Sequence, residues 1–130
     1  VAVHSAVCVR RGGPGLLPRL RVTSRFCSNY AQERGLDTGA AQGSAIVPIM
    51  VGGSRVGGFR ATRLLARGID VMPITFPAVK EGAARLRFFL SASHTEEQIR
   101  KTIDTVVEEI PVAREIVEKF RREHQDEQNA

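Results

Sequence analysis

The sequence has 130 residues, of which 42% are hydrophobic and 25% are charged. This length and composition are typical of one globular domain, and no apolar run reaches the roughly 18 to 20 residues that a membrane-spanning helix needs. The two cysteines, Cys8 and Cys27, are too few for a disulfide scaffold and lack metal-ligand spacing. We therefore expect a protein of the reducing cytoplasm, without a membrane segment.

The net charge of +5 comes from the N-terminal half. Residues 1–70 contain ten arginines and three acidic residues, whereas residues 71–130 contain nine basic and eleven acidic residues. Nucleic-acid binding usually combines clustered Lys and Arg with stacking aromatic residues, but the chain has three lysines and one tyrosine. We therefore expect no nucleic-acid partner and interpret the basic excess as a solvated or domain-facing surface.

The first predicted helix covers residues 16–34 and ends at Gly35. Its apolar residues recur at helical spacing and define one buried stripe. They are Leu16, Leu20, Cys27 and Ala31, with Leu17 and Tyr30 beside them. Before this helix, the alternating valines of residues 1–11 are typical of a strand, but the Gly and Pro residues that follow break the pattern, so this segment stays ambiguous.

The second predicted helix covers residues 54–67. One side carries Gly57, Ala61, Leu64 and Leu65, and the other carries Arg60, Arg63 and Arg67. Both helices end in the same Arg-Gly-apolar-Asp pattern, in which a left-handed glycine lets the next residue pack back on the last turn. The glycine-rich stretch 52–58 matches neither common phosphate-loop motif, so we interpret it as a turn with Ser54 as the N-cap.

Three short apolar segments are predicted strands: residues 45–51, 70–76 and 85–91. Pro48 and Pro73 have no amide donor, so their strands should lie at sheet edges or be interrupted there. In the third segment one face is apolar and the other carries the guanidinium groups of Arg85 and Arg87.

The C-terminal segment is predicted to be helical. Thr95 and Gln98 form a capping box, and apolar residues continue at helical spacing to Ile110. Pro111 should interrupt this helix, and a further helix should follow before a frayed polar end. The order helix, strand, helix, strand, strand, helix, helix predicts an α+β fold, with a small, mainly antiparallel sheet and helices on one face.

Few residues suggest chemistry by themselves. His4, His94 and His124 have no second ligand at metal spacing and no nucleophile partner, so we predict neither a metal site nor a catalytic triad. His94 precedes the capping Thr95, and its expected role is local structure at a strand-to-helix turn. Arg87 offers a planar fork suited to a carboxylate, but the residues alone favour a surface ion pair.

A longer pattern is more specific. The run GIDVMPITFPAVKEGAARLRFFLSASHTEEQI (68–99) resembles the C-terminal portion of the α-oxoamine synthases, and so do ERGLDTG (33–39) and SAIVPIMVG (44–52). The resemblance implies the small C-terminal domain of an aspartate-aminotransferase-like enzyme that uses pyridoxal 5'-phosphate (PLP). It divides the chain into a linker or helix tail from a missing large domain (1–13), the small domain (14–110) and a helical extension or linker (111–130).

Enzymes of this family condense an amino acid with an acyl thioester, carried by CoA or a carrier protein, and release CO₂ to form an α-amino ketone. PLP serves as the electron sink. The resemblance implies a homodimeric acyltransferase in which Arg87 binds the substrate carboxylate. A loop that would flank the thioester entrance contains Phe76, Pro77, Ala78 and Val79. Members of the biotin pathway usually have an arginine and two prolines at 75–77, where this chain has Thr-Phe-Pro, a departure that argues against a pimeloyl substrate.

The family's PLP lysine has no counterpart here, because Lys80, Lys101 and Lys119 do not lie in its motif. The resemblance therefore implies no catalytic or cofactor-binding residue in this chain, and a fragment that is inactive alone. Two alternatives stay open: the domain of an aminotransferase-like PLP enzyme, and a non-catalytic α+β interaction module.

Overall fold

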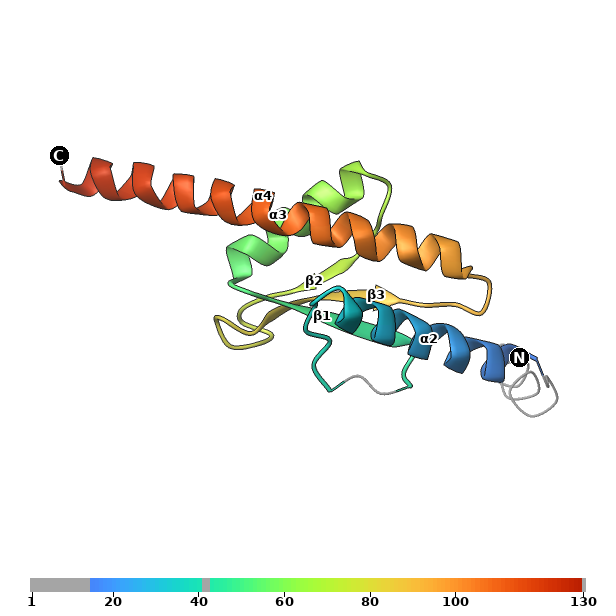
Figure 1. Ribbon diagram of the computed structural model, residues 1–130. Coiled ribbons are helices and arrows are strands. Elements are labelled where there is room, and N and C mark those ends of the chain that lie inside the picture. The colour runs from blue at the N-terminus through green and yellow to red at the C-terminus, as the bar shows by residue number, and fades with distance from the viewer. Residues whose placement is uncertain (1–14, 41–42, 130) are drawn as a thin grey trace, which may run out of the picture.

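The computed structural model describes residues 15–40 and 43–129, with side chains described as far as residue 125. The elements are α2 (Leu16–Glu33), β1 (Ile46–Gly52), α3 (Ser54–Ala66), β2 (Met72–Ile74), β3 (Ala84–Phe89) and α4 (Glu96–Asn129) (Figure 1). The predicted order is confirmed up to the start of α4. The ambiguous segment 1–11 lies outside the described residues.

The three strands form one antiparallel sheet in the order β1-β3-β2. Pro48 of β1 pairs with Arg87, and Pro73 of β2 pairs with Leu86, both of them on the middle strand β3. Both prolines therefore lie on edge strands, as predicted, because a proline cannot donate to the hydrogen-bond ladder of a central strand.

One face of the sheet is covered by helices and the other is open. Side chains alternate between the two faces along a strand, and Val47, Ile49, Leu86 and Phe88 all point into one core. All three helices contribute to that core. Their buried residues include Cys27 and Ala31 of α2, Leu64 of α3, and Ile99, Ile103 and Val106 of α4. A small antiparallel sheet with helices on one face confirms the predicted α+β class.

The two predicted glycine caps are confirmed. Gly35 and Gly68 have φ angles of 78° and 80°, a region that glycine adopts without strain. The following amides, of Leu36 and Ile69, donate back to the carbonyls of Ala31 and Leu64, both at 2.9 Å. Each bond gives a hydrogen-bond donor to a carbonyl in the last turn of its helix and directs the chain back toward the core.

The predicted helix faces are wrong at their margins. Leu16 and Leu17 are 54% and 38% exposed, because the buried residues of α2 begin only at Thr23. On α3, Leu65 is 60% exposed whereas Arg60 is only 3% exposed. The reason is that α3 packs against α4 as well as against the sheet, and Arg60 reaches toward α4.

The predicted break at Pro111 is also wrong, because α4 is one helix of 34 residues that includes this proline. Pro111 has no N–H to donate to the carbonyl of Val107, a defect that costs about 3 kcal/mol in a helix interior. The packed face continues past it, since Ala113 is fully buried and Ile116 is half-buried. Figure 1 shows the C-terminal half of α4 extending beyond the sheet. No helix among the described residues is long and apolar enough to cross a membrane.

Candidate functional site

Arg87 lies in the middle of the open face of the sheet. It occupies the central strand, in register between Pro48 on one side and Met72 on the other. Its side chain is exposed, and no ion pair within the described part of the chain includes it. A planar guanidinium that is not paired with a carboxylate of the chain can bind the carboxylate of a ligand through two parallel hydrogen bonds.

The surface around Arg87 is largely apolar. Met72 and Phe89 are 52% and 54% exposed, and the neighbouring Ile46 is half-buried. Arg85 lies on the same face, where it is half-buried and its Nε donates to the carbonyl of Ala83 at 3.4 Å. An exposed apolar surface of this kind is typical of a region that packs against another domain or a ligand.

The predicted thioester loop, residues 76–79, follows β2 at the end of the sheet where Ile74 pairs with Arg85. Phe76 is 63% exposed, and its N–H donates to Ser54 Oγ at 3.0 Å. Within the described residues, no hydrogen bond or ion pair joins this loop to Arg87. The loop thus follows the end of β2 that lies beside Arg85, and it makes no polar contact with Arg87.

The N-terminus of α3 already holds an anion from the chain itself. Its N-cap is Gly53, so the prediction that Ser54 caps the helix is wrong by one residue. Ser54 instead donates twice to the Glu81 carboxylate, from Oγ at 2.6 Å and from its backbone N–H at 2.9 Å. Both bonds lower the pKa of Glu81, and the bond from the hydroxyl has the larger effect. Because a carboxylate occupies the positive end of the helix, the geometry supports the turn and not a phosphate cradle.

His94 makes the local contacts expected of it. The N–H of Ser91 donates to His94 Nδ1 at 2.9 Å, which closes the turn between β3 and α4. The capping box is confirmed by reciprocal bonds between Thr95 and Gln98, at 3.0 and 3.2 Å. His94 also lines a pocket of about 190 Å³ together with Asp70 and Gln98. The Nδ1 contact fixes the ring at the turn and supports a structural role.

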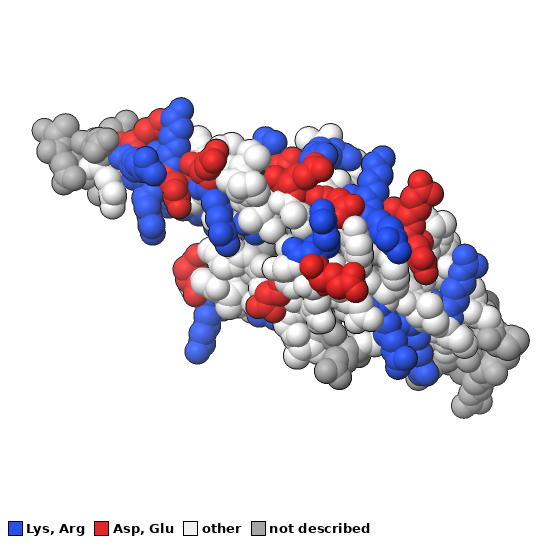
Figure 2. Space-filling view, viewed as in Figure 1, with Lys and Arg blue, Asp and Glu red and all other residues white. Residues whose placement is uncertain are grey.

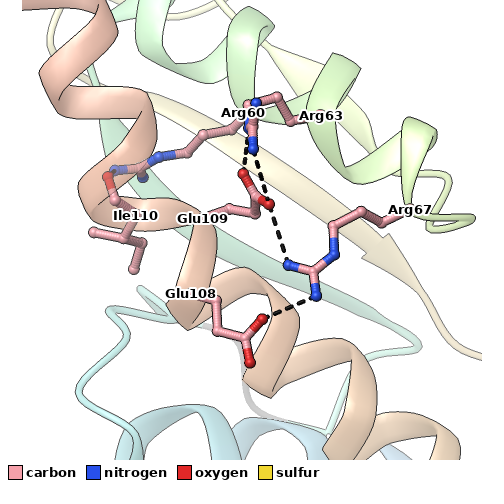
Figure 3. Close-up of polar contacts among 6 residues, drawn as sticks. All are labelled: Arg60, Arg63, Arg67, Glu108, Glu109 and Ile110. Carbon is pink, nitrogen blue, oxygen red and sulfur yellow. Dashed lines mark hydrogen bonds and ion pairs between the residues drawn. The ribbon is translucent and has the colours of Figure 1, made fainter.

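Sequence reasoning missed a charge cluster between α3 and α4. Glu109 is 4% exposed and accepts hydrogen bonds from Arg63 and from Arg67, the latter at 3.1 Å (Figure 3). Arg67 also donates to Glu108 at 2.9 Å. Both arginines hold the pKa of Glu109 below its ordinary value of 4.5, and Arg63 has the larger effect. The sequence carried only a partial signal, since these arginines share a helix face that we predicted to be polar.

Arg60 belongs to the same cluster but has no carboxylate partner in it (Figure 3). Its Nη2 donates to the carbonyl of Ile110 at 3.4 Å, and its buried Nε has no hydrogen-bond partner among the described residues. Burial first, and then the positive charge of Arg114, lowers its pKa. The cluster joins two helices on the covered side of the sheet, so it is structural and separate from Arg87.

The three lysines of the chain lie apart from the sheet that carries Arg87. Lys80 and Lys101 are exposed, and Lys119 is exposed and 4.0 Å from Glu123. None of these lysines belongs to the sheet that carries Arg87. The described residues also contain no group of three or more His, Cys, Asp or Glu side chains that could hold a metal ion. On the open face of the sheet, Arg87 offers an available guanidinium on an apolar surface.

No protein-family model matches the chain. Among curated proteins, 8-amino-7-oxononanoate synthase from Symbiobacterium thermophilum is 31% identical over 102 residues. Human mitochondrial 2-amino-3-ketobutyrate coenzyme A ligase is 36% identical over 86 residues, and serine palmitoyltransferase 2 of Caenorhabditis elegans is 29% identical over 96. These matches cover 78%, 66% and 74% of this chain but 26%, 20% and 17% of the relatives. The chain thus spans about a quarter or less of their length.

Solved structures have the same fold. The 8-amino-7-oxononanoate synthase of Francisella tularensis aligns with a TM-score of 0.63 at 21% identity, over 73% of this chain and 27% of that one. A serine palmitoyltransferase from S. paucimobilis, with a bound PLP–myriocin aldimine, aligns with a TM-score of 0.65 at 25% identity, over 74% of this chain and 24% of that one. The chain is therefore homologous to the C-terminal portion of the α-oxoamine synthases.

Proposed function

We propose that the chain is the C-terminal domain of a PLP-dependent α-oxoamine synthase, with Arg87 as the residue that binds the carboxylate of the amino-acid substrate. In this proposal residues 14–110 form the domain, residues 1–13 connect it to a large PLP-binding domain, and residues 111–130 form a helical extension. The complete enzyme would be a cytoplasmic homodimer that transfers an acyl group from CoA or a carrier protein.

The observation that carries the proposal is the position of Arg87. Homology supplies the family, and the open face supplies an exposed guanidinium on the middle strand without an ion-pair partner in the described residues. Arg63 and Arg67 of α3 contrast with it, because both bind Glu109. A fixed strand backbone limits the freedom of the side chain that a substrate must order.

The apolar residues beside Arg87 support a covering domain. Met72 and Phe89 expose more than half of their surface on the open face. If a large PLP-binding domain packs there, water is excluded around Arg87, and its bond to a carboxylate becomes stronger than on an exposed surface. The loop 76–79 would then lie at the rim of the same interface and could contact the acyl thioester.

The test uses the full-length protein that contains this chain, reconstituted with PLP. Titration with glycine, alanine and serine, followed by the absorbance of the bound cofactor, measures amino-acid binding. Arg87→Leu should weaken that binding by about 100-fold, the order expected when a charged hydrogen-bond partner is lost, and Arg87→Lys should restore little. Arg55→Leu, an exposed arginine of α3, provides the matched control and should leave binding unchanged.

Product analysis separates the proposal from its alternatives. Consumption of a thioester with release of CO₂ supports a synthase, whereas transfer of the amino group without CO₂ indicates an aminotransferase. A full-length protein that binds no PLP would reject both and leave a non-catalytic module. Equal amino-acid binding by Arg87→Leu and Arg55→Leu would reject the role of Arg87 alone.

A further inference from the structure

The outer face of α2 is basic, and residues 16–32 of this helix contain no acidic residue. Its first 14 residues contain Arg19, Arg21 and Arg25, and the first acidic residue of the whole sequence is Glu33. All three arginines are exposed, and none takes part in an ion pair among the residues that the structure describes. This surface accounts for much of the N-terminal charge excess.

Three other arginines of the N-terminal half are already paired. Arg34 lies 3.0 Å from Asp104, and Arg63 and Arg67 bind glutamates of α4. The acidic C-terminal half of the sequence thus neutralises the C-terminal part of α3 and the end of α2, but not the beginning of α2. In Figure 2, Lys and Arg atoms gather without Asp or Glu atoms at the lower right, over the N-terminal half of α2.

One exposed apolar side chain lies among these charges. Val22 is 64% exposed between Arg21 and Arg25. The buried residues of α2 pack into the core on the covered side of the sheet, so its outer face points away from that core. An apolar centre with a charged rim is the usual composition of a protein–protein interface.

We propose that this α2 basic face, formed by Arg19, Arg21, Val22 and Arg25, binds an acidic helical segment of a partner protein. Arginine forks match carboxylates in bidentate geometry, and Val22 gives an apolar contact at the centre of the face. A nucleic acid would be expected to use exposed stacking aromatics, and the nearest aromatic residues, Phe26 and Tyr30, are partly buried with Arg100 over their rings. A membrane surface would require a wider apolar face than one valine.

The proposal does not depend on the role of Arg87, which lies on the other side of the sheet. Its test measures binding of a synthetic amphipathic helical peptide made of Glu, Leu and Ala, by fluorescence anisotropy. The test variant replaces the three arginines of the face with glutamine, which preserves helix propensity. A charge-matched control replaces three exposed arginines of α4 with glutamine: Arg114, Arg121 and Arg122.

We expect the α2 variant to bind the peptide about 10-fold more weakly, the order given by three exposed ion pairs, and the α4 control to bind within about 2-fold of the unchanged protein. Val22→Asp should weaken binding without removing any arginine, which keeps the test independent of the triple variant. Equal losses in both triple variants would overturn the proposal. So would tighter binding, through the same arginines, to a single-stranded RNA oligonucleotide or to phosphatidylserine vesicles.

Discussion

Replacing the buried Arg60 with methionine should make the protein more stable. Arg60 is 3% exposed, its Nε has no partner, and its one hydrogen bond reaches the carbonyl of Ile110 at 3.4 Å. A bond that long contributes at the low end of the usual 0.5 to 1.5 kcal/mol. Since α4 is continuous, the Ile110 carbonyl keeps its helical donor when the guanidinium is removed.

The gain comes from ending the burial of an uncompensated charge. Replacing buried charged groups by apolar residues of similar size stabilises proteins by roughly 1 to 4 kcal/mol, and loss of the Ile110 contact places Arg60→Met near the lower value, about 1 kcal/mol. For a domain of this size the midpoint of thermal unfolding should rise by about 4 °C. Methionine is unbranched and favours a helix, so it fits the same space between α3 and α4.

Urea unfolding followed by far-ultraviolet circular dichroism measures the effect. Arg63→Met is the matched control, because it makes the same substitution one helical turn away but removes a partner of the buried Glu109. We expect the two variants to change the free energy of unfolding in opposite directions. A lower stability for Arg60→Met would show that the buried guanidinium holds α3 and α4 together more strongly than its one contact implies, and the reasoning would be refuted.

Three further predictions concern single residues. The pKa of Glu109 is lowered in the folded state, so its carboxylate stabilises the fold above the ordinary pKa of 4.5, and this contribution is lost as the pH falls below that value. The difference in the free energy of unfolding between the unchanged protein and Glu109→Gln should therefore disappear in acid. Burial raises the pKa of Cys27 from 9.0 to about 11. In a Cys8→Ser background its thiol should therefore react with a disulfide reagent at pH 8 only at the rate of unfolding. The free energy of unfolding should fall as the pH rises from 9 toward 11. Pro111→Ala should raise the free energy of unfolding by about 1 to 3 kcal/mol in urea unfolding, since it restores a helical donor at an exposed position, and no change would contradict a continuous α4.

Features set by adjacent residues were predictable from the sequence. The left-handed glycines at 35 and 68 and the capping box of Thr95 and Gln98 depend on contacts within six residues, and all are present. The edge positions of Pro48 and Pro73 follow from a missing N–H group, whatever the rest of the fold. Local chemistry therefore specified the ends of the elements better than their packed faces.

Features set by packing between distant segments were not predictable. The Glu81 carboxylate reaches Ser54 across 27 residues, and Glu109 reaches Arg63 across 46. Pro111 reads locally as a helix break, but an apolar face on both sides of it keeps the helix packed. In each case a partner brought by the fold outweighs the local preference, and no single-sequence pattern identifies that partner.

The same distinction applies to the arginines. The family resemblance singles out Arg87, and the fold adds which arginines face a carboxylate. The fold sorts them by what lies opposite: Arg63 and Arg67 face a buried glutamate, and Arg34 lies beside Asp104. On the open face, alternation along β3 places Arg87 opposite Pro48 and Met72, neither of which can accept its charge. An arginine held on a central strand without a carboxylate has its hydrogen-bonding capacity left for a ligand, and this is the property that the proposed role of Arg87 requires.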